Sequence, residues 1–210
     1  MRKISSWLVA AVLTVLTFTA CAQNDASYTE GKHYKRLETP VFAGGKDVQV
    51  TEFFWYGCGH CYTFEPLVSR WKKTLPEGVK FIYSPAMWAP VMSLHAKMYY
   101  TAQALGKFDD LHGAIFNAMM VEKKRLASEE EIKALFVANG VDAAAFDKTF
   151  SSFGVNGQVR QAESRMRGAK VSGTPMLMVN GKYTIDSRAA GGQANMLKIA
   201  DYLIAKELSR

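Results

Sequence analysis

Cysteine is scarce in this chain of 210 residues, which contains only Cys21, Cys58 and Cys61. A secreted domain that depends on disulfides for its fold carries several pairs, so the low cysteine content argues against such a scaffold. Cys58 and Cys61 also lack the further ligands of a tetrahedral zinc site, because no second Cys-x-x-Cys pair and no paired histidine spacing occur. We therefore expect neither a metal ion nor a cofactor.

Signatures of nucleotide and nucleic-acid binding are lacking as well. The sequence has no P-loop, no GxGxxG fingerprint and no internal repeat. The net charge of +7 is mild and includes Arg2 and Lys3 near the N-terminus. The densest basic run, Lys123-Lys124-Arg125, fits a solvated helix face better than a nucleic-acid patch. We expect no nucleic-acid partner.

The N-terminal residues have the pattern of an export signal. After the positive Arg2 and Lys3, residues 7–18 are apolar apart from two threonines, and Ala20-Cys21-Ala22 supplies the small residues of a signal-peptidase site. The apolar stretch is too short for a comfortable membrane span. We expect residues 1–22 to be a signal peptide cleaved after Ala22. The alternative is a lipoprotein in which Cys21 is lipidated. Either route places the domain outside the cytoplasm, where disulfides persist.

Cys58-Gly59-His60-Cys61 follows an apolar run at residues 50–55, where a predicted strand meets a predicted helix. A cysteine at the start of a helix lies at the positive end of the helix dipole and loses its proton easily. The loop between the two cysteines is too short for a disulfide there to stabilise the fold much. The pair therefore predicts electron chemistry, in which disulfides are exchanged with other proteins.

The order of the predicted elements indicates an α/β protein. Continuous or alternating apolar residues predict strands, whereas apolar residues three and four apart predict helices. The predicted strands are 47–55, 79–84, 175–179 and 182–185, and the last two are joined by a type I′ turn at Asn180-Gly181. The predicted helices are 59–73, 91–105, 108–123, 128–138, 142–150, 157–167 and 193–207. An all-helical module therefore interrupts a sheet layer.

Four stretches of the chain carry a family resemblance. They are Glu52-Phe53-Phe54, Cys58-x-His60-Cys61, Phe64-Glu65, and Gly173-Thr174-Pro175 ahead of a strand and a hairpin. In these residues the chain resembles the thioredoxin superfamily and, within it, the DsbA family of periplasmic thiol:disulfide oxidases. The resemblance covers nearly all of the chain after the leader. It implies an α/β thioredoxin fold with an inserted all-helical subdomain.

The resemblance also implies a domain division and a set of partners. The division is a signal peptide at 1–22, a first part of the thioredoxin-fold domain with its leader at 23–86, a helical insertion at 87–170 and the second part at 171–210. The expected substrates are reduced or unfolded exported proteins, to which the Cys58–Cys61 disulfide is donated. A membrane oxidase of the DsbB type is expected to reoxidise a monomeric, periplasmic protein. If Cys21 is lipidated, the domain is membrane-anchored and faces the periplasm.

The expected catalytic roles fall on six residues. Cys58 is the expected nucleophile, and Cys61 is the resolving thiol one turn further into the helix. As an imidazolium, His60 would favour the Cys58 thiolate. The Thr174–Pro175 bond should be cis beside the disulfide, with the Thr174 backbone free to pair with an extended substrate. The sixth residue lies in the strand below the cysteines.

Glu52 lies in that apolar strand. If it is buried, its pKa is raised and it can relay protons to Cys61, whereas the alternative is an exposed edge position. Glu65 is either a second charge near the site or a solvated helix residue. An apolar peptide-binding groove is predicted beside the thiols, although packing in the core is the default interpretation of each aromatic or methionine residue. The groove candidates are Trp55, Tyr56, Gly173, Met87 and Trp88.

Two departures from the family bear on the direction of exchange. DsbA proteins usually have Pro-His between the cysteines and Val before the cis-proline, whereas this chain has Gly59-His60 and Thr174. That combination is similar to eukaryotic protein disulfide isomerase. In addition, Tyr83 stands about where DsbA proteins have a buried lysine. A disulfide isomerase or reductase that uses the same residues is therefore one alternative, and a chaperone-like binding module is the other.

Overall fold

A computed structural model describes residues 28–41 and 45–209 of the chain. The predicted signal peptide, including Cys21, lies outside these residues. Within them the strands form one mixed five-stranded sheet in the order β1-β5-β4-β2-β3. The strands are β1 Lys35–Arg36, β2 Val48–Phe54, β3 Val79–Pro85, β4 Met176–Val179 and β5 Tyr183–Asp186.

The central strand β2 determines where the thiol pair lies. It is parallel to β3 and antiparallel to β4, and Phe53 is paired with Met176. Six of its seven residues are buried, as expected for a strand covered on both faces. Because β2 and β4 run in opposite directions, the segment that follows β2 and the segment that precedes β4 meet at the same end of these two neighbouring strands.

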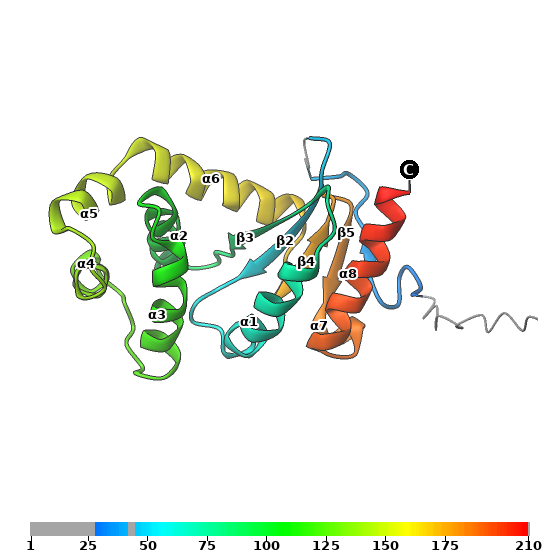
Figure 1. Ribbon diagram of the computed structural model, residues 1–210, viewed down its shortest axis with the longest axis horizontal. Helices are drawn as coiled ribbons and strands as arrows, with labels where there is room; N and C mark the ends of the chain where they lie inside the picture. The colour runs from blue at the N-terminus through cyan, green and yellow to red at the C-terminus, as the bar shows by residue number, and fades with distance from the viewer. Residues whose placement is uncertain (1–27, 42–44, 210) are drawn as a thin grey trace, which may run out of the picture.

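Helices account for most of the remaining described residues. They are α1 Gly59–Trp71, α2 Pro90–Ala104, α3 Phe108–Met120, α4 Glu129–Ala138, α5 Ala143–Phe150, α6 Phe153–Gly168, α7 Ser187–Ala190 and α8 Gln193–Leu208, with a 3-10 turn, η1, at Lys72–Thr74. In Figure 1, α2 to α5 gather at one side of the sheet and α6 runs from that group back to it. α8 packs on β2, β4 and β5, and α6 returns to contact β3.

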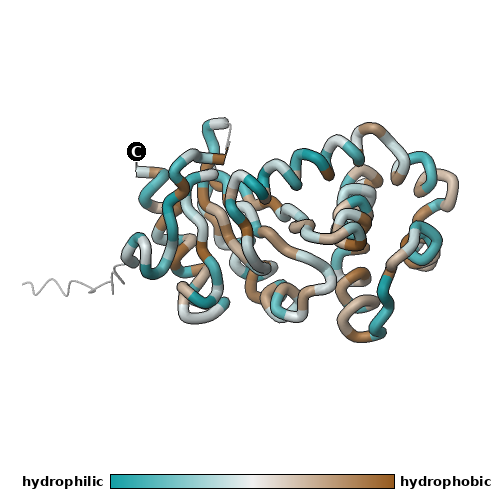
Figure 2. The backbone as a smooth tube through the Cα atoms, turned by 180° about the vertical axis from the view of Figure 1, so that it is seen from behind, coloured by the Kyte–Doolittle hydropathy of each residue, from teal (hydrophilic) through white to brown (hydrophobic). Residues whose placement is uncertain are grey.

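Local sequence explains several of these helices. The apolar stripe of α1 buries Cys61, Phe64, Val68 and Trp71, which are three or four residues apart. The N-cap side chains of α4, α5 and α6 each accept a hydrogen bond from the backbone amide three residues further along. In Figure 2 the strands are mostly hydrophobic and α6 is largely hydrophilic, and the buried residues of α6 are Val155, Ala162 and Met166.

The structure confirms the α/β organisation and corrects some details. The hairpin turn has φ values of 50° at Asn180 and 65° at Gly181, as a type I′ turn requires. The helix predicted at 108–123 ends at Met120, so the basic run Lys123-Lys124-Arg125 lies in an exposed loop rather than on a helix. The short elements β1 and α7 were not predicted, because two and four residues show no periodicity. Over the described ranges, no helix combines the length and the apolar character needed to cross a membrane.

Candidate functional site: the thiol pair

Cys58 and Cys61 lie at the junction between β2 and α1. Cys58 is the N-cap residue of α1, with φ −100° and ψ 113°, and its amide donates to the Trp55 carbonyl oxygen at 3.0 Å. Both cysteines are free thiols; Cys58 is half-buried, whereas Cys61 is 1% exposed. A partner protein can therefore approach the first sulfur, while the second is covered.

The segment before β4 lies against the first thiol. The Thr174–Pro175 peptide bond is cis, as predicted. Cys58 Sγ lies 3.4 Å from the Thr174 carbonyl oxygen, to which it donates a hydrogen bond when the thiol is protonated. Pro175 itself is buried and Gly173 is exposed. The two motifs of the sequence, although far apart in the chain, therefore form one site.

The two thiols have opposite acidities. Hydrogen bonding from the Cys61 side chain lowers the pKa of Cys58 to about 5, against the opposing effect of partial burial, with smaller contributions from Thr174 and from the backbone of Cys61 and His60. Burial, reinforced by the neighbouring Cys58 sulfur, raises the pKa of Cys61 far above its ordinary value. At neutral pH the reduced pair therefore holds one thiolate, on the exposed sulfur, and one proton, on the buried sulfur.

The His60 residue is exposed, but its backbone makes contacts at the site that the sequence did not predict. Its amide is among the groups that lower the pKa of Cys58. Its carbonyl oxygen accepts from Gln193 Nε2 at 2.6 Å and from Thr63 Oγ1 at 3.1 Å. Gln193 is the first residue of α8, so this bond fixes the first turn of α1 to the C-terminal helix. No sequence signal linked Gln193 to the cysteines.

Glu52 is buried, with 1% of its surface exposed, which excludes the alternative edge position. Its neighbours in the sheet are Tyr83 on β3 and Leu177 on β4. Among the described residues its Oε2 atom has no hydrogen-bond partner. Burial raises the pKa of Glu52 well above its usual range, and the nearby Glu65 carboxylate adds to this effect. A carboxyl group beneath Cys61 is therefore protonated at pH values where free glutamate is ionised.

Comparison with known proteins assigns the chain to a family. A sequence profile of the DSBA-like thioredoxin domain matches residues 76–203. Thiol:disulfide interchange protein DsbA of Pseudomonas aeruginosa is 39% identical over 202 residues, which cover 95% of each chain. DsbA of Azotobacter vinelandii is 38% identical and covers 100% of this chain and 99% of its own length. The chain belongs to the DsbA family.

Solved structures of the DsbA family share this architecture. The crystal structure of Pseudomonas aeruginosa DsbA has a TM-score of 0.83 at 40% identity, over 87% of this chain and 95% of that one. A cysteine variant of Proteus mirabilis DsbA, solved with the non-covalently bound peptide PWATCDS, has a TM-score of 0.75 at 26% identity, over 88% of this chain and 100% of that one. The thioredoxin fold with a helical insertion and the thiol:disulfide oxidoreductase class inferred from the sequence are therefore confirmed.

Near the thiols of this DsbA-family protein lies a buried polar cluster that the sequence did not predict. Tyr83 donates to both carboxylate oxygens of Glu65, at 2.8 and 3.1 Å, and accepts from Lys72 Nζ at 3.3 Å. His112 Nε2 lies 3.3 Å from Glu65 Oε2, and His112 Nδ1 lies 2.8 Å from the Tyr56 hydroxyl. Glu65 is thus a charge near the site rather than a solvated helix residue. His112 comes from α3, and nothing in its local sequence indicated these partners.

The predicted groove is only partly at the surface. Trp88 is 49% exposed, Gly173 is exposed and Trp55 is half-buried, so these three remain candidates. Tyr56 and Met87 are buried in the core, at 1% and 7%, so for these two the default of core packing holds and the predicted place on the groove rim is wrong. Tyr56 turns inward because its hydroxyl bonds to His112, and the Met87 amide bonds to a sulfur of α6. A surface hollow does lie beside the cis bond; its lining includes Gly173, Thr174, Pro175, Asp186 and Arg188.

Proposed function

We propose that the Cys58–Cys61 disulfide oxidises pairs of thiols in reduced, newly exported proteins. The contrast in acidity between the exposed Cys58 and the buried Cys61 is the observation that carries this proposal. A stabilised Cys58 thiolate stabilises the reduced protein, so the disulfide form is a strong oxidant. It also makes Cys58 a good leaving group, so mixed disulfides with substrates break readily.

The reaction proceeds in two exchanges. A substrate thiolate attacks Cys58 Sγ; a new sulfur–sulfur bond forms, the Cys58–Cys61 bond breaks, and Cys61 leaves with the electron pair and takes up a proton. A second substrate thiol then loses its proton, and its thiolate attacks the substrate sulfur of the mixed disulfide. Cys58 leaves as a thiolate. The substrate has lost two electrons and gained a disulfide, and the cysteine pair holds those electrons.

Three neighbours support these steps. The Thr174 backbone next to the cis bond is suited to pair with an extended substrate segment, as in strand addition. The relative from Proteus mirabilis binds a cysteine-containing peptide without a covalent bond, which agrees with recognition before exchange. Glu52, buried and protonated, is positioned to supply the proton that Cys61 needs when it leaves. His60 contributes its amide and, when charged, its imidazolium to the thiolate.

The cellular setting follows from the export signal and from the family. We place the protein in the periplasm as a monomer, released by cleavage after Ala22 or anchored through Cys21. A DsbB-type membrane oxidase would remove the two electrons from the reduced pair. The compartment rests on the N-terminal export pattern, and the oxidase partner rests on the resemblance to the DsbA family. A mass measurement of the mature protein from the membrane and soluble fractions separates cleavage from lipidation.

One assay separates the oxidase from its rivals. Gly59-His60 and Thr174, which are similar to protein disulfide isomerase, favour isomerisation as the second candidate. The oxidised protein is incubated with a fully reduced substrate, and the reduced protein with the same substrate carrying scrambled disulfides. An oxidase forms disulfides rapidly in the first case and leaves the second largely scrambled, whereas an isomerase recovers the second. If a variant with both cysteines replaced by serine acts like the wild type, the chain is a binding module.

A further inference from the structure

Trp55 and His95 connect the thiol site to the helical insert. The indole Nε1 of Trp55 donates a hydrogen bond to Nδ1 of His95, with the two atoms 2.9 Å apart. The two rings are stacked, with centroids 6.1 Å apart and an interplanar angle of 18°. His95 lies on α2 and is 2% exposed. The contact therefore joins a half-buried residue just after β2 to a buried residue on the first helix of the insert.

The partners of His95 determine its tautomer. Its Nε2 atom lies 3.2 Å from the Arg125 carbonyl oxygen and 3.1 Å from the Leu126 carbonyl oxygen. Carbonyl oxygens only accept and an indole N–H only donates, so the hydrogen of a neutral imidazole must be on Nε2. Burial lowers the pKa of His95, which favours the neutral form. Both ring nitrogens are thus occupied, and the ring is held from two sides.

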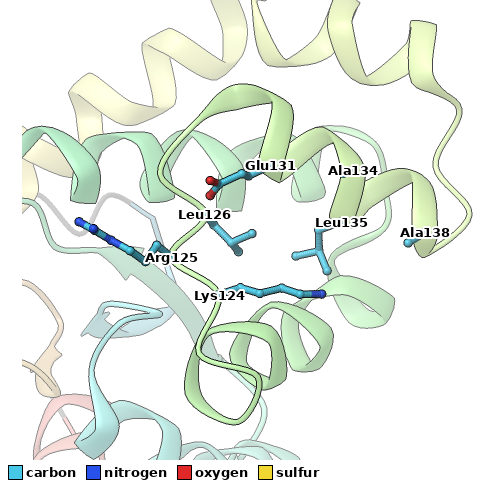
Figure 3. Close-up of a pocket in the computed structure, with 7 residues that line it drawn as sticks. All are labelled: Lys124, Arg125, Leu126, Glu131, Ala134, Leu135 and Ala138. Atoms are coloured by element: carbon cyan, nitrogen blue, oxygen red, sulfur yellow. The ribbon is translucent and has the colours of Figure 1, made fainter.

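The backbone carbonyl groups that accept the hydrogen bond from His95 are held in place by packing within the insert. Leu126 has a φ of 47°, in the left-handed region, and its side chain is only 2% exposed. Figure 3 shows the segment 124–126, with the Leu126 side chain directed toward Leu135 of α4 and the Arg125 side chain directed the opposite way. Both leucines line a surface hollow of the insert. The carbonyl partners of His95 therefore belong to a segment anchored by apolar packing.

The other contacts of Trp55 are with the turn formed by Gly57 and Cys58. Its carbonyl oxygen accepts the hydrogen bond from the Cys58 amide at 3.0 Å. A Cβ atom added to Gly57 would lie 2.3 Å from the six-membered ring of Trp55. Because only a residue without a side chain leaves room for the indole, the ring lies directly against the turn that presents Cys58. A displaced indole would free this turn to move.

We propose that His95 is a positioning residue for the thiol site: it fixes the indole of Trp55, and Trp55 holds the turn at Gly57 and Cys58. This inference rests on the proposed thiolate chemistry of Cys58. The sulfur receives its stabilising hydrogen bonds only while the turn keeps its geometry. The insert thereby contributes to the acidity of Cys58 through the hydrogen bond between the Trp55 indole and the His95 imidazole.

The test is a double-mutant cycle read out by thiolate titration. His95→Phe keeps an aromatic ring but removes both hydrogen bonds, and Trp55→Phe removes the indole donor. The ultraviolet absorbance of the Cys58 thiolate is followed against pH in the reduced proteins. We expect each single variant to raise the Cys58 pKa by about half a unit or more, the scale of one lost hydrogen bond. The double variant should shift it no further than the larger single change, because both act through one contact.

Tyr99→Phe is the matched control. Tyr99 is also a buried residue of α2, and its hydroxyl donates to the Tyr83 carbonyl oxygen at 3.2 Å, away from Trp55. This variant should lower the melting temperature but leave the Cys58 pKa unchanged. If His95→Phe does not fold, Trp55→Phe tests the same bond from the other side. The inference is overturned if either variant titrates like the wild type or if the two shifts add. An ordinary Cys58 pKa in the wild type would instead overturn the proposed function.

Discussion

The Cys58 thiol and the Thr174 carbonyl oxygen are 3.4 Å apart, although 116 positions of the chain separate the two residues. The antiparallel pairing of β2 with β4 brings them together, because the end of one strand meets the start of the other. The helical insert occupies most of the sequence between them. The meeting of the two motifs therefore depends on the sheet, and the insert reaches the site through contacts such as His95 with Trp55 and His112 with Glu65.

Replacing each cysteine separately should give different outcomes. Cys58→Ser should abolish transfer, because the exposed sulfur that exchanges with the substrate is lost. Cys61→Ser should accumulate a mixed disulfide between Cys58 and the substrate, because no resolving thiol remains. Mass spectrometry under non-reducing conditions, with a cysteine-containing peptide in disulfide form, detects the adduct. Oxidation of a dithiol substrate by Cys58→Ser would contradict the assigned roles.

The contribution of Cys58 to the stability of the reduced protein should be lost as the pH falls from about 8.5 to about 5. The Cys58 pKa is about 5 in the folded protein, whereas an unfolded cysteine titrates near 8.5. The folded thiolate therefore adds stability that is fully present above the unfolded pKa and is lost as the pH falls through the folded pKa. The raised pKa of Cys61 acts only above this window, where the unfolded thiol ionises.

Urea unfolding under reducing conditions measures this dependence. The free energy of unfolding of the wild type should fall across the window more steeply than that of Cys58→Ser, which has no thiol to titrate there. Parallel curves for the two proteins would show that folding does not stabilise the Cys58 thiolate.

Glu52→Gln should make the protein more stable and less active. Because burial raises the Glu52 pKa, the carboxyl contributes most favourably below the unfolded value of about 4.3, and this contribution is lost as the pH rises through the folded pKa. The variant, which cannot ionise, should therefore gain stability relative to the wild type between pH 4 and pH 7, by about 1.4 kcal/mol for each pH unit over which only the unfolded carboxyl is ionised.

The activity of the same variant tests the proton relay. If Glu52 supplies the proton to Cys61, dithiol oxidation should slow by roughly tenfold or more, since a positioned proton donor commonly contributes at least that much. Stopped-flow rates with a dithiol peptide, compared at equal peptide concentration, measure the effect. An unchanged rate would show that Glu52 lowers the stability of the protein but takes no part in the reaction.

Gly57→Ala and Gly59→Ala should differ in stability. A Cβ at Gly57 would lie 2.3 Å from the Trp55 ring, whereas a Cβ at Gly59 meets nothing within 4 Å. Gly57→Ala should destabilise the protein by about 1–3 kcal/mol, as overpacking does. Gly59→Ala, in the first turn of α1, should be neutral or slightly stabilising. Equal effects on thermal unfolding would show that Trp55 adapts without cost.

Most of the correct predictions from the sequence rest on short local motifs. The cysteine pair, the Thr174–Pro175 bond and the hairpin turn are each determined by a few adjacent residues, so their geometry could be anticipated. The long helices were recognisable because their apolar residues recur at helical spacing. Burial of Glu52 was one of two alternatives, since alternation within a strand does not reveal which face is covered.

Contacts between distant segments could not be anticipated. Tyr56 was a candidate for the peptide groove with core packing as the default, and the contact that places it in the core comes from His112 on α3. His95 carries no local signal either, because its partners come from the end of β2 and from the loop after α3. These positions depend on how the insert packs against the sheet, and a single sequence does not encode that packing in any periodic pattern.

Thiolate titration of the reduced wild-type protein is the most direct measurement of the whole account. The increase in ultraviolet absorbance with pH reports ionisation of Cys58, and Cys58→Ser supplies the baseline. A midpoint near pH 5 is predicted. A midpoint near 8.5, the value of an ordinary cysteine, would contradict the claim that this fold stabilises the exposed sulfur as an anion.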